Sequence, residues 1–122
     1  MVKLDHLTIP VRDHLTSRDW YVRNLGMKVD FEAPDRRTTA LQDDSGLTLF
    51  LEEAPQHVGS AGCILYFQVE DIEATHRALS DAGIPFVHPP QKEYWGYGAE
   101  LRDPDGYRIR LWDEKSMREK GQ

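Results

Sequence analysis

The chain has 122 residues, of which 39% are hydrophobic and 30% charged, a balance typical of a globular domain rather than a disordered or membrane chain. Its net charge of -6, with no basic run longer than Arg36-Arg37, argues against nucleic acid as a partner. No apolar run approaches the ~18 residues of a membrane helix and no signal peptide is visible, so we expect a cytoplasmic protein without a membrane partner. The single cysteine, Cys63, excludes an internal disulfide and a multi-cysteine metal site.

The first half of the chain predicts a strand, a helix and further strands. In the segment 6–13, Leu7 and Ile9 alternate with more polar residues, as in a half-buried strand. Asp13 is a suitable N-cap for a helix that ends at Gly26 and whose apolar positions are Leu15, Val22 and Leu25. Residues 47–52 alternate again, which predicts the last strand of this half.

The second half repeats this order after a segment of linker composition, residues 54–62. Leu65, Phe67 and Val69 are expected to pack inward, and Asp71 then caps a helix that ends at Gly83 before Pro85, with apolar-face positions Ile72, Thr75, Leu79 and Ala82. Asp105-Gly106 predicts a hairpin turn, and we expect residues 115–120 to be a solvated tail.

Aligned in this way, the chain is two copies of one βαβββ unit, because its turn and cap residues recur in the same order. We therefore expect an α+β fold, built as one domain over residues 1–122 from modules of about 1–55 and 61–114. Strand alternation leaves one face of each sheet free of the helices, and we expect these faces to surround a central concavity. The side chains on it would be His6, Thr8, Pro10, Thr48, Phe50, Glu52, Ile64, Tyr66, Gln68, Arg108, Arg110 and Trp112.

The paired modules, His6 in the first strand, the Asp-Pro-Asp-Gly-Tyr turn over 103–107 and Trp95-Gly96 together resemble the vicinal oxygen chelate superfamily. That group includes glyoxalase I, extradiol dioxygenases and the bleomycin-resistance proteins. The resemblance covers nearly the whole chain and is closest in pattern to the metal-free bleomycin-resistance-like branch. It implies a homodimer, and it says little about any one reaction because the fold hosts many.

The resemblance also implies four positions that hold a divalent metal in the enzymes of the superfamily. Here these are His6, Phe50, Ile64 and Arg110. Phenylalanine and isoleucine carry no donor atom, and arginine is a fixed cation, so we expect no metal cofactor. The alternative is an atypical divalent-metal site in which Glu52 or Glu100 joins His6.

His6 is open to three interpretations: a relic, a hydrogen-bonding pocket residue, or a catalytic base if the protein has one. The other histidines, which lie in predicted helices or loops, are expected at the surface: His14, His57, His76 and His88. Cys63 is expected to be structural.

Arg110 either binds a ligand or forms a structural ion pair with Glu52 or Glu100, whereas Arg108 is expected to be a solvated edge residue. As a ligand group, Arg110 favours an anionic or neutral aromatic ligand, although the acidic composition of the chain would suit a cation. The local signal carries more weight for the ligand.

Aromatic residues give the second signal for a planar ligand. Trp95 lies in a Gly-rich segment (95–98, with Tyr97) that is expected to be a loop able to close over a site, while Trp112 is expected at a rim or interface. The candidate ligand-binding residues are therefore His6, Thr48, Phe50, Tyr66, Gln68, Trp95, Arg110 and Trp112.

These features predict a non-enzymatic binding protein that sequesters a planar or aromatic small molecule, as in antibiotic resistance. Two alternatives stay open. One is a lyase, dioxygenase or isomerase of the same superfamily, metal-dependent or metal-free with His6 as its base. The other is a partner-binding module without a ligand.

Overall fold

The computed structural model describes residues 2–59 and 62–122, which form two compact units. We call them unit 1 (Met1–Gly59) and unit 2 (Ser60–Gln122). The division falls inside the expected linker over 54–62, of which residues 60 and 61 lie outside the described part of the chain. Residues 55–57 of that segment form a single 3-10 turn.

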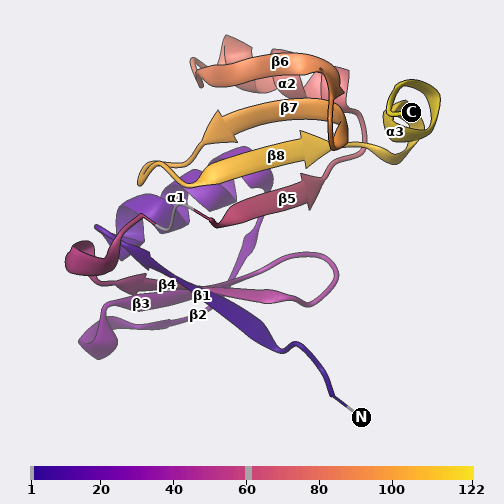
Figure 1. Cartoon of the computed structure of the whole chain (residues 1–122). Coiled ribbons are helices and arrows are strands. Elements are labelled where there is room, and N and C mark those ends of the chain that lie inside the picture. Colours follow the sequence, from indigo (N-terminus) through magenta and orange to yellow (C-terminus); the bar gives the residue numbers. More distant parts are fainter. Residues whose placement is uncertain (1, 60–61) are drawn as a thin grey trace. The chain divides into compact units, whose positions relative to one another are not determined.

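Unit 1 is a four-stranded mixed sheet with one helix (Figure 1). The strand order is β1-β4-β3-β2, in which β1 and β4 run parallel and the other pairs are antiparallel. The elements are β1 (His6–Val11), α1 (His14–Leu25), β2 (Lys28–Ala33), β3 (Thr38–Gln42) and β4 (Thr48–Glu53).

Unit 2 has the same strand order, β5-β8-β7-β6, with the same parallel and antiparallel pairings. Its elements are β5 (Ile64–Gln68), α2 (Ile72–Asp81), β6 (Phe86–Glu93), β7 (Gly96–Arg102), β8 (Arg108–Trp112) and α3 (Glu114–Lys120). The expected α+β fold of two βαβββ modules is therefore confirmed. None of the helices in the described residues has the length and apolar character needed to cross a membrane.

The main helix of each unit is fixed at its start by two carboxylates. Asp13 caps α1 and Asp71 caps α2 through side-chain bonds to first-turn amides, as the sequence predicts. A second carboxylate at the end of the last sheet strand accepts the first helical amide of each helix. Glu53 Oε1 accepts from His14 N at 3.2 Å, and Asp113 Oδ2 accepts from Ile72 N at 2.6 Å. Each helix is thereby tied to the last strand of its own sheet.

The two helices bury different kinds of residue. Helix α2 buries Ile72 and Leu79, as expected, but α1 buries His14, Ser17 and Tyr21. The predicted apolar face of α1 is wrong, since Leu15 is 44% exposed and Val22 is exposed too. The reason is a polar contact: His14 Nδ1 lies 2.9 Å from Thr39 Oγ1 on β3, so this side of the helix faces the sheet.

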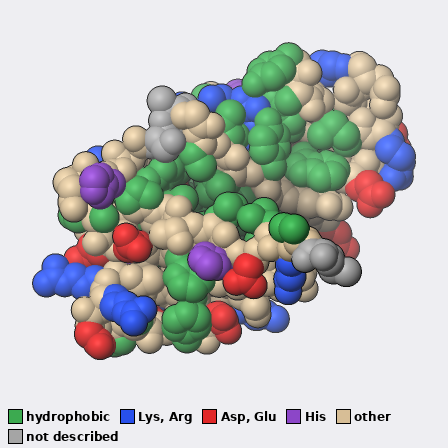
Figure 2. Space-filling view, turned by 60° about the horizontal axis from the view of Figure 1, so that its bottom comes forward, with side chains coloured by type: hydrophobic (Ala, Val, Ile, Leu, Met, Phe, Trp, Pro, Cys, Tyr) green, Lys and Arg blue, Asp and Glu red, His purple; other side chains and the backbone are tan. Residues whose placement is uncertain are grey.

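Several large apolar side chains of unit 1, on α1 and outside it, lie at the surface. They are Leu4, Leu7, Leu15, Val22, Val29 and Phe31. Figure 2 shows apolar side chains interrupting the polar surface on the face that it presents.

The C-terminal segment forms a helix, which the sequence does not predict, although Lys115, Arg118, Glu119 and Lys120 are exposed as expected. Asp113 caps α3 through the amide of Ser116 at 2.6 Å. Met117 packs on β7, where its sulfur accepts a hydrogen bond from the amide of Tyr97 at 3.4 Å. Gly96 leaves room for this sulfur, because a Cβ there would lie 2.2 Å from it. The apolar contact of Met117 explains why the charged segment is ordered against the sheet.

Candidate ligand-binding site

One row of side chains crosses the sheet of unit 2 on the face opposite α2. Tyr66 on β5 is paired with Arg110 on β8, Arg110 with Glu100 on β7, and Glu100 with His88 on β6. Directly opposed residues in neighbouring strands point to the same face of a sheet. Strand register alone thus places a cation between a phenol and a carboxylate.

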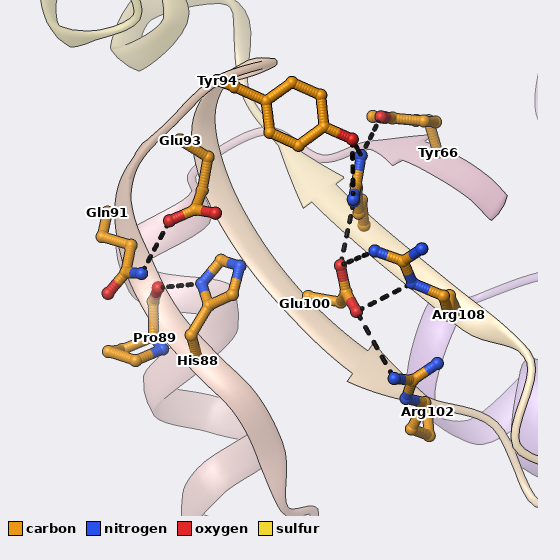
Figure 3. A network of polar contacts seen from close by, with 10 residues as sticks. Tyr66, His88, Pro89, Gln91, Glu93, Tyr94, Glu100, Arg102 and Arg108 are labelled. Atoms are coloured by element: carbon orange, nitrogen blue, oxygen red, sulfur yellow. Dashed lines mark hydrogen bonds and ion pairs between the residues drawn. The ribbon is translucent and has the colours of Figure 1, made fainter.

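Glu100 is the anion that holds this row together (Figure 3). Arg110 Nε donates to Glu100 Oε1 at 2.9 Å, and Arg108 donates to both carboxylate oxygens at 3.2 Å. Arg102 lies 3.9 Å from the same carboxylate. Arg108 is therefore not the solvated edge residue that the sequence predicts, because the buried Glu100 draws it over the sheet. The ion pair of Arg110 with Glu100, one of the two expected interpretations, is present.

Both ends of this ion pair favour the charged state. Burial alone disfavours the Glu100 carboxylate, but the hydrogen bonds from Arg108 and Arg110 outweigh burial and hold the pKa of Glu100 below its ordinary value. Burial likewise disfavours the Arg110 cation, yet its bonds to Glu100, Tyr94 and Tyr66 raise its pKa above the ordinary value. Arg110 is a permanent cation that is only 2% exposed.

Three aromatic rings surround the guanidinium of Arg110. Its central carbon lies 5.3 Å from the ring centre of Tyr66, 5.4 Å from that of Tyr94 and 5.1 Å from that of Trp95. Tyr66 and Trp95 also meet edge to face, with centroids 5.4 Å apart. Two of the rings reach solvent, because Tyr66 is 48% and Tyr94 86% exposed. We call Arg110, Glu100 and these three aromatic residues the Arg110 cluster.

The segment that carries Trp95 is a hairpin rather than the loop that the sequence predicts. Tyr94 and Trp95 form the turn between β6 and β7, and residues 96–98 belong to β7. Gly98 makes room for the indole, since a Cβ there would lie 2.6 Å from Trp95 Cη2 and 2.2 Å from the backbone oxygen of Leu111. The glycines of this segment are therefore needed for close packing rather than for loop movement.

Other aromatic candidates of unit 2 lie apart from this cluster. Tyr97 points to the helix side, where its hydroxyl donates to Glu73 Oε1 at 2.7 Å, and this bond raises the pKa of Tyr97 to about 12. Trp112 and Gln68 face each other across β8 and β5, with Trp112 half-buried and Gln68 exposed.

The candidates from unit 1 form a smaller group of their own. His6 is opposite Thr48 in the pairing of β1 with β4, and its ring lies 4.6 Å from that of Phe50. Phe50 also meets Phe31, with ring centres 5.6 Å apart. His6 Nδ1 lies 3.1 Å from the carboxylate of Asp5, and both side chains are exposed. This is a solvated imidazole beside an apolar pair of rings.

The prediction that the other four histidines lie at the surface is confirmed for some of them and wrong for others. His57 is exposed as expected, but His14 is buried by its contact with Thr39. His76 is half-buried against Phe86, with ring centres 4.6 Å apart, and His88 lies in strand β6. Helical or loop context alone could not show which histidine faces the sheet.

Sequence reasoning missed Tyr94, the most exposed member of the Arg110 cluster. Its hydroxyl accepts from both terminal nitrogens of Arg110 at 3.3 Å, across the sheet from its own turn (Figure 3). The available signal was its position directly before Trp95, in a turn between two strands of a hairpin.

The residues at the four metal-holding positions that the resemblance implies do not fit a divalent metal. Of these residues only His6 has a ligating atom, and Arg110 is a buried cation. The atypical alternative is weakened as well, because both Glu100 oxygens already accept from guanidiniums. Across residues 2–59 and 62–122, no three His, Cys, Asp or Glu side chains form a group suited to a metal ion.

Comparison with known proteins places this geometry in context. The family model described as Glyoxalase/Bleomycin resistance protein/Dioxygenase superfamily matches residues 3–111. No curated protein matches the chain significantly. Among solved structures, UcmS2 is 27% identical at a TM-score of 0.71, covering 91% of this chain and 97% of its own.

Two further solved structures share the fold at lower identity. TnmS3, an antibiotic binding protein from Streptomyces sp. CB03234, has a TM-score of 0.76 at 23% identity, with 93% of this chain and 96% of its own covered. A superfamily member from Sphaerobacter thermophilus DSM 20745 has a TM-score of 0.76 at 24% identity, with 93% and 98% covered.

Proposed function

Since the chain belongs to the Glyoxalase/Bleomycin resistance protein/Dioxygenase superfamily, we propose that it is a binding protein which sequesters a planar aromatic small molecule without a metal and without catalysis. The superfamily itself does not decide between binding and catalysis, because one fold hosts many functions. The proposal therefore depends on the side chains of this chain.

The observation that carries the proposal is the Arg110 cluster. A buried guanidinium is surrounded by three aromatic rings, and the rings of Tyr66 and Tyr94 are open to solvent. Exposed aromatic rings beside a fixed cation suit a flat ligand, which stacks on the rings. TnmS3, which shares the fold, is an antibiotic binding protein, and this supports the same class of function here.

Absence of a metal is part of the proposal and follows from donor chemistry. Phe50 and Ile64 offer no donor, and Arg110 would repel a cation at the position where the enzymes of the superfamily need a carboxylate. His6 remains as a lone exposed imidazole beside Asp5. A single histidine does not make a catalytic metal site.

We also propose that the protein is a homodimer. Unit 1 exposes Leu15 and Val22 on α1 and Val29 and Phe31 on β2, and a partner chain packed on this unit would cover such side chains. Light scattering during size-exclusion chromatography tests this directly, and a mass near the 14.1 kDa of one chain would contradict it.

Ligand binding is tested by titrating the protein with a panel of planar aromatic compounds and following tryptophan fluorescence. We expect saturable quenching that Trp95→Phe largely removes and that Tyr66→Ala weakens by about tenfold, since aromatic contacts contribute on the order of 1 kcal/mol or more. Trp20→Phe, in helix α1 of unit 1, is the matched control and should keep both the quenching and the affinity.

The enzymatic alternative predicts a different result. Protein purified without chelators would then contain stoichiometric divalent metal that disappears in His6→Ala. That outcome, together with activity restored by the metal, would overturn the binding-protein proposal. A metal-free protein that is stabilised by planar compounds in thermal unfolding would support it.

A further inference from the structure

The two sides of the Arg110 guanidinium are held very differently. On the Nε side, Glu100 Oε1 accepts a hydrogen bond at 2.9 Å. At the other edge, one phenolic oxygen of Tyr94 is shared by both terminal nitrogens, at 3.3 Å from each, and one of these nitrogens also donates to the Tyr66 hydroxyl. Protein N–H···O bonds normally measure about 2.7–3.2 Å, so the two bonds to Tyr94 are slightly long.

A single oxygen between the two terminal nitrogens occupies the place where guanidinium groups bind carboxylates. A carboxylate there accepts two parallel charge-assisted bonds, which are shorter and about twice as strong as neutral ones. Tyr94 offers one neutral oxygen to the same two donors. A ligand carboxylate that replaces the phenol would therefore form stronger hydrogen bonds with the two terminal nitrogens.

Local charge favours the same kind of ligand, although the chain as a whole carries -6. Around Glu100, the guanidiniums of Arg102, Arg108 and Arg110 outnumber the single carboxylate. The side chains of Arg102 and Arg108 are partly open to solvent. This excess of positive charge attracts an anion and repels a cation.

Tyr94 is placed so that it can leave. It lies in the turn between β6 and β7 and is 86% exposed, whereas its neighbour Trp95 is packed against Gly98. Figure 3 shows the hydroxyl of Tyr94, which comes from this turn, pointing toward that of Tyr66 on β5. In the free protein the Tyr94 hydroxyl accepts hydrogen bonds from Arg110, and this is favourable because a buried cation with unsatisfied donors is costly.

We infer, on the basis of the proposed function, that the ligand is a planar aromatic acid whose carboxylate binds the terminal edge of Arg110, and that the Tyr94 hydroxyl occupies this place until the ligand displaces it. The inference gives the ligand a charge that the binding proposal leaves open. It also makes Tyr94 a specificity-determining residue, because its hydroxyl competes with the carboxylate of the ligand for the same two nitrogens.

A matched pair of probes tests the charge: 2-naphthoate, and 2-naphthamide, which has the same ring system and no charge. In the full chain we expect naphthoate to bind about tenfold tighter or more, because charge-assisted bonds replace neutral ones. Naphthoate binding should weaken as salt is raised, and naphthamide binding should not. Arg110→Lys keeps the charge that pairs with Glu100 but loses the two-nitrogen edge, so it should lose most of the preference for naphthoate.

Tyr94→Phe tests the displacement. Removal of the competing hydroxyl should tighten naphthoate binding by about threefold and change naphthamide binding less than that, because the free site no longer has to be vacated. Tyr97→Phe is the control, since it removes a phenolic hydroxyl from the same hairpin that bonds to Glu73 and not to Arg110. It should leave both affinities unchanged.

Three results would contradict the inference, and they separate it from the function on which it rests. Equal saturable binding of the two probes would overturn the anionic ligand and leave the binding proposal standing. Weaker binding of both probes to Tyr94→Phe would show that the Tyr94 hydroxyl contacts the ligand and does not compete with it. Failure of the naphthalene probes and of every other planar compound to bind the wild-type chain would overturn the proposed function itself.

Discussion

The two units follow the same chain path, yet the central rows of their sheets have opposite chemistry. Strand register makes the positions equivalent, because each row joins the first strand, the last strand and the strand beside it. In order, the row of unit 1 is Thr8, Phe50 and Ala40, and that of unit 2 is Tyr66, Arg110 and Glu100. One backbone arrangement therefore supports an uncharged row in one unit and a buried ion pair in the other.

This difference shows that the polar row is not required by the fold. Ala40 is fully buried in unit 1, where Phe50 packs with Phe31 and His6. A buried ion pair costs desolvation and is often no more stabilising than apolar packing. The charged row of unit 2 is thus better explained by recognition than by stability.

Breaking the ion pair should produce the largest change. Glu100→Ala leaves Arg110 as a buried cation without its carboxylate, and loss of one partner from a buried pair costs about 3–5 kcal/mol. Urea unfolding should show this decrease in the free energy of unfolding. Glu52→Ala, which removes an exposed carboxylate from strand β4 of unit 1, is the control and should change stability by about 0.5 kcal/mol or less.

A decrease below about 1 kcal/mol in Glu100→Ala would contradict the picture of a buried, mutually dependent pair. In that case the guanidinium must find solvent when its partner is removed. Naphthoate binding would then show whether the guanidinium of the variant is exposed, because an exposed guanidinium still attracts an anion.

The helices give the next comparison. Leu79 of α2 is 8% exposed, whereas Leu15 of α1 is 44% exposed. Leu79→Ala should therefore cost about 2–4 kcal/mol through lost burial and a cavity, and Leu15→Ala less than about 1 kcal/mol. Thermal or urea unfolding of the two variants measures the difference. Equal losses would mean that Leu15 is covered, for example by a partner chain in the proposed dimer.

The fold could be predicted well because the residues that cap helices and form turns act locally. Asp13, Asp71, Gly26 and the Asp105-Gly106 turn act within a few residues of themselves, and each occupies the predicted place. The internal repeat then allows the order of elements in one half of the chain to be predicted for the other half. Periodicity failed in α1, where the hydrogen bond of His14 to Thr39 on a distant strand decides which face is buried.

The site was only partly predictable for the same reason. Alternation placed Tyr66 and Arg110 on one face, and the ion pair with Glu100 was among the expected partners. Neither the bonds of Arg108 to Glu100 nor the reach of Tyr94 across the sheet can be read from spacing, because both depend on which side chains converge in space. Likewise, the order of the C-terminal segment depends on Met117 packing at Gly96.

Gly98 offers a smaller test of the difference between the units. The register places Gly98 where unit 1 has Thr38, a buried side chain with room of its own. In unit 2 that room is taken by Trp95, so Gly98→Ala should cost about 1–3 kcal/mol by overpacking and should shift the tryptophan emission. Thr38→Ala, the equivalent position, should leave that emission unchanged. An unaltered spectrum in Gly98→Ala would show that Trp95 does not depend on this glycine.

The smallest expected effect is the pH dependence that the charged row adds. The pKa of Glu100 is lowered in the folded chain from an ordinary value of 4.5, so the unfolded chain binds the proton more readily. The stability that this provides is fully present above about pH 4.5 and is lost as the pH falls through the folded pKa. Between about pH 6 and about pH 3, the range in which carboxyl groups ordinarily titrate, the urea midpoint should fall less in Glu100→Gln than in wild type. The effect is smaller than that of Glu100→Ala, because a protonated carboxyl still fills the space between Arg108 and Arg110 and accepts hydrogen bonds. An equal acid slope in wild type and Glu100→Gln would show that the carboxylate is not the group whose charge the folded sheet of unit 2 stabilises.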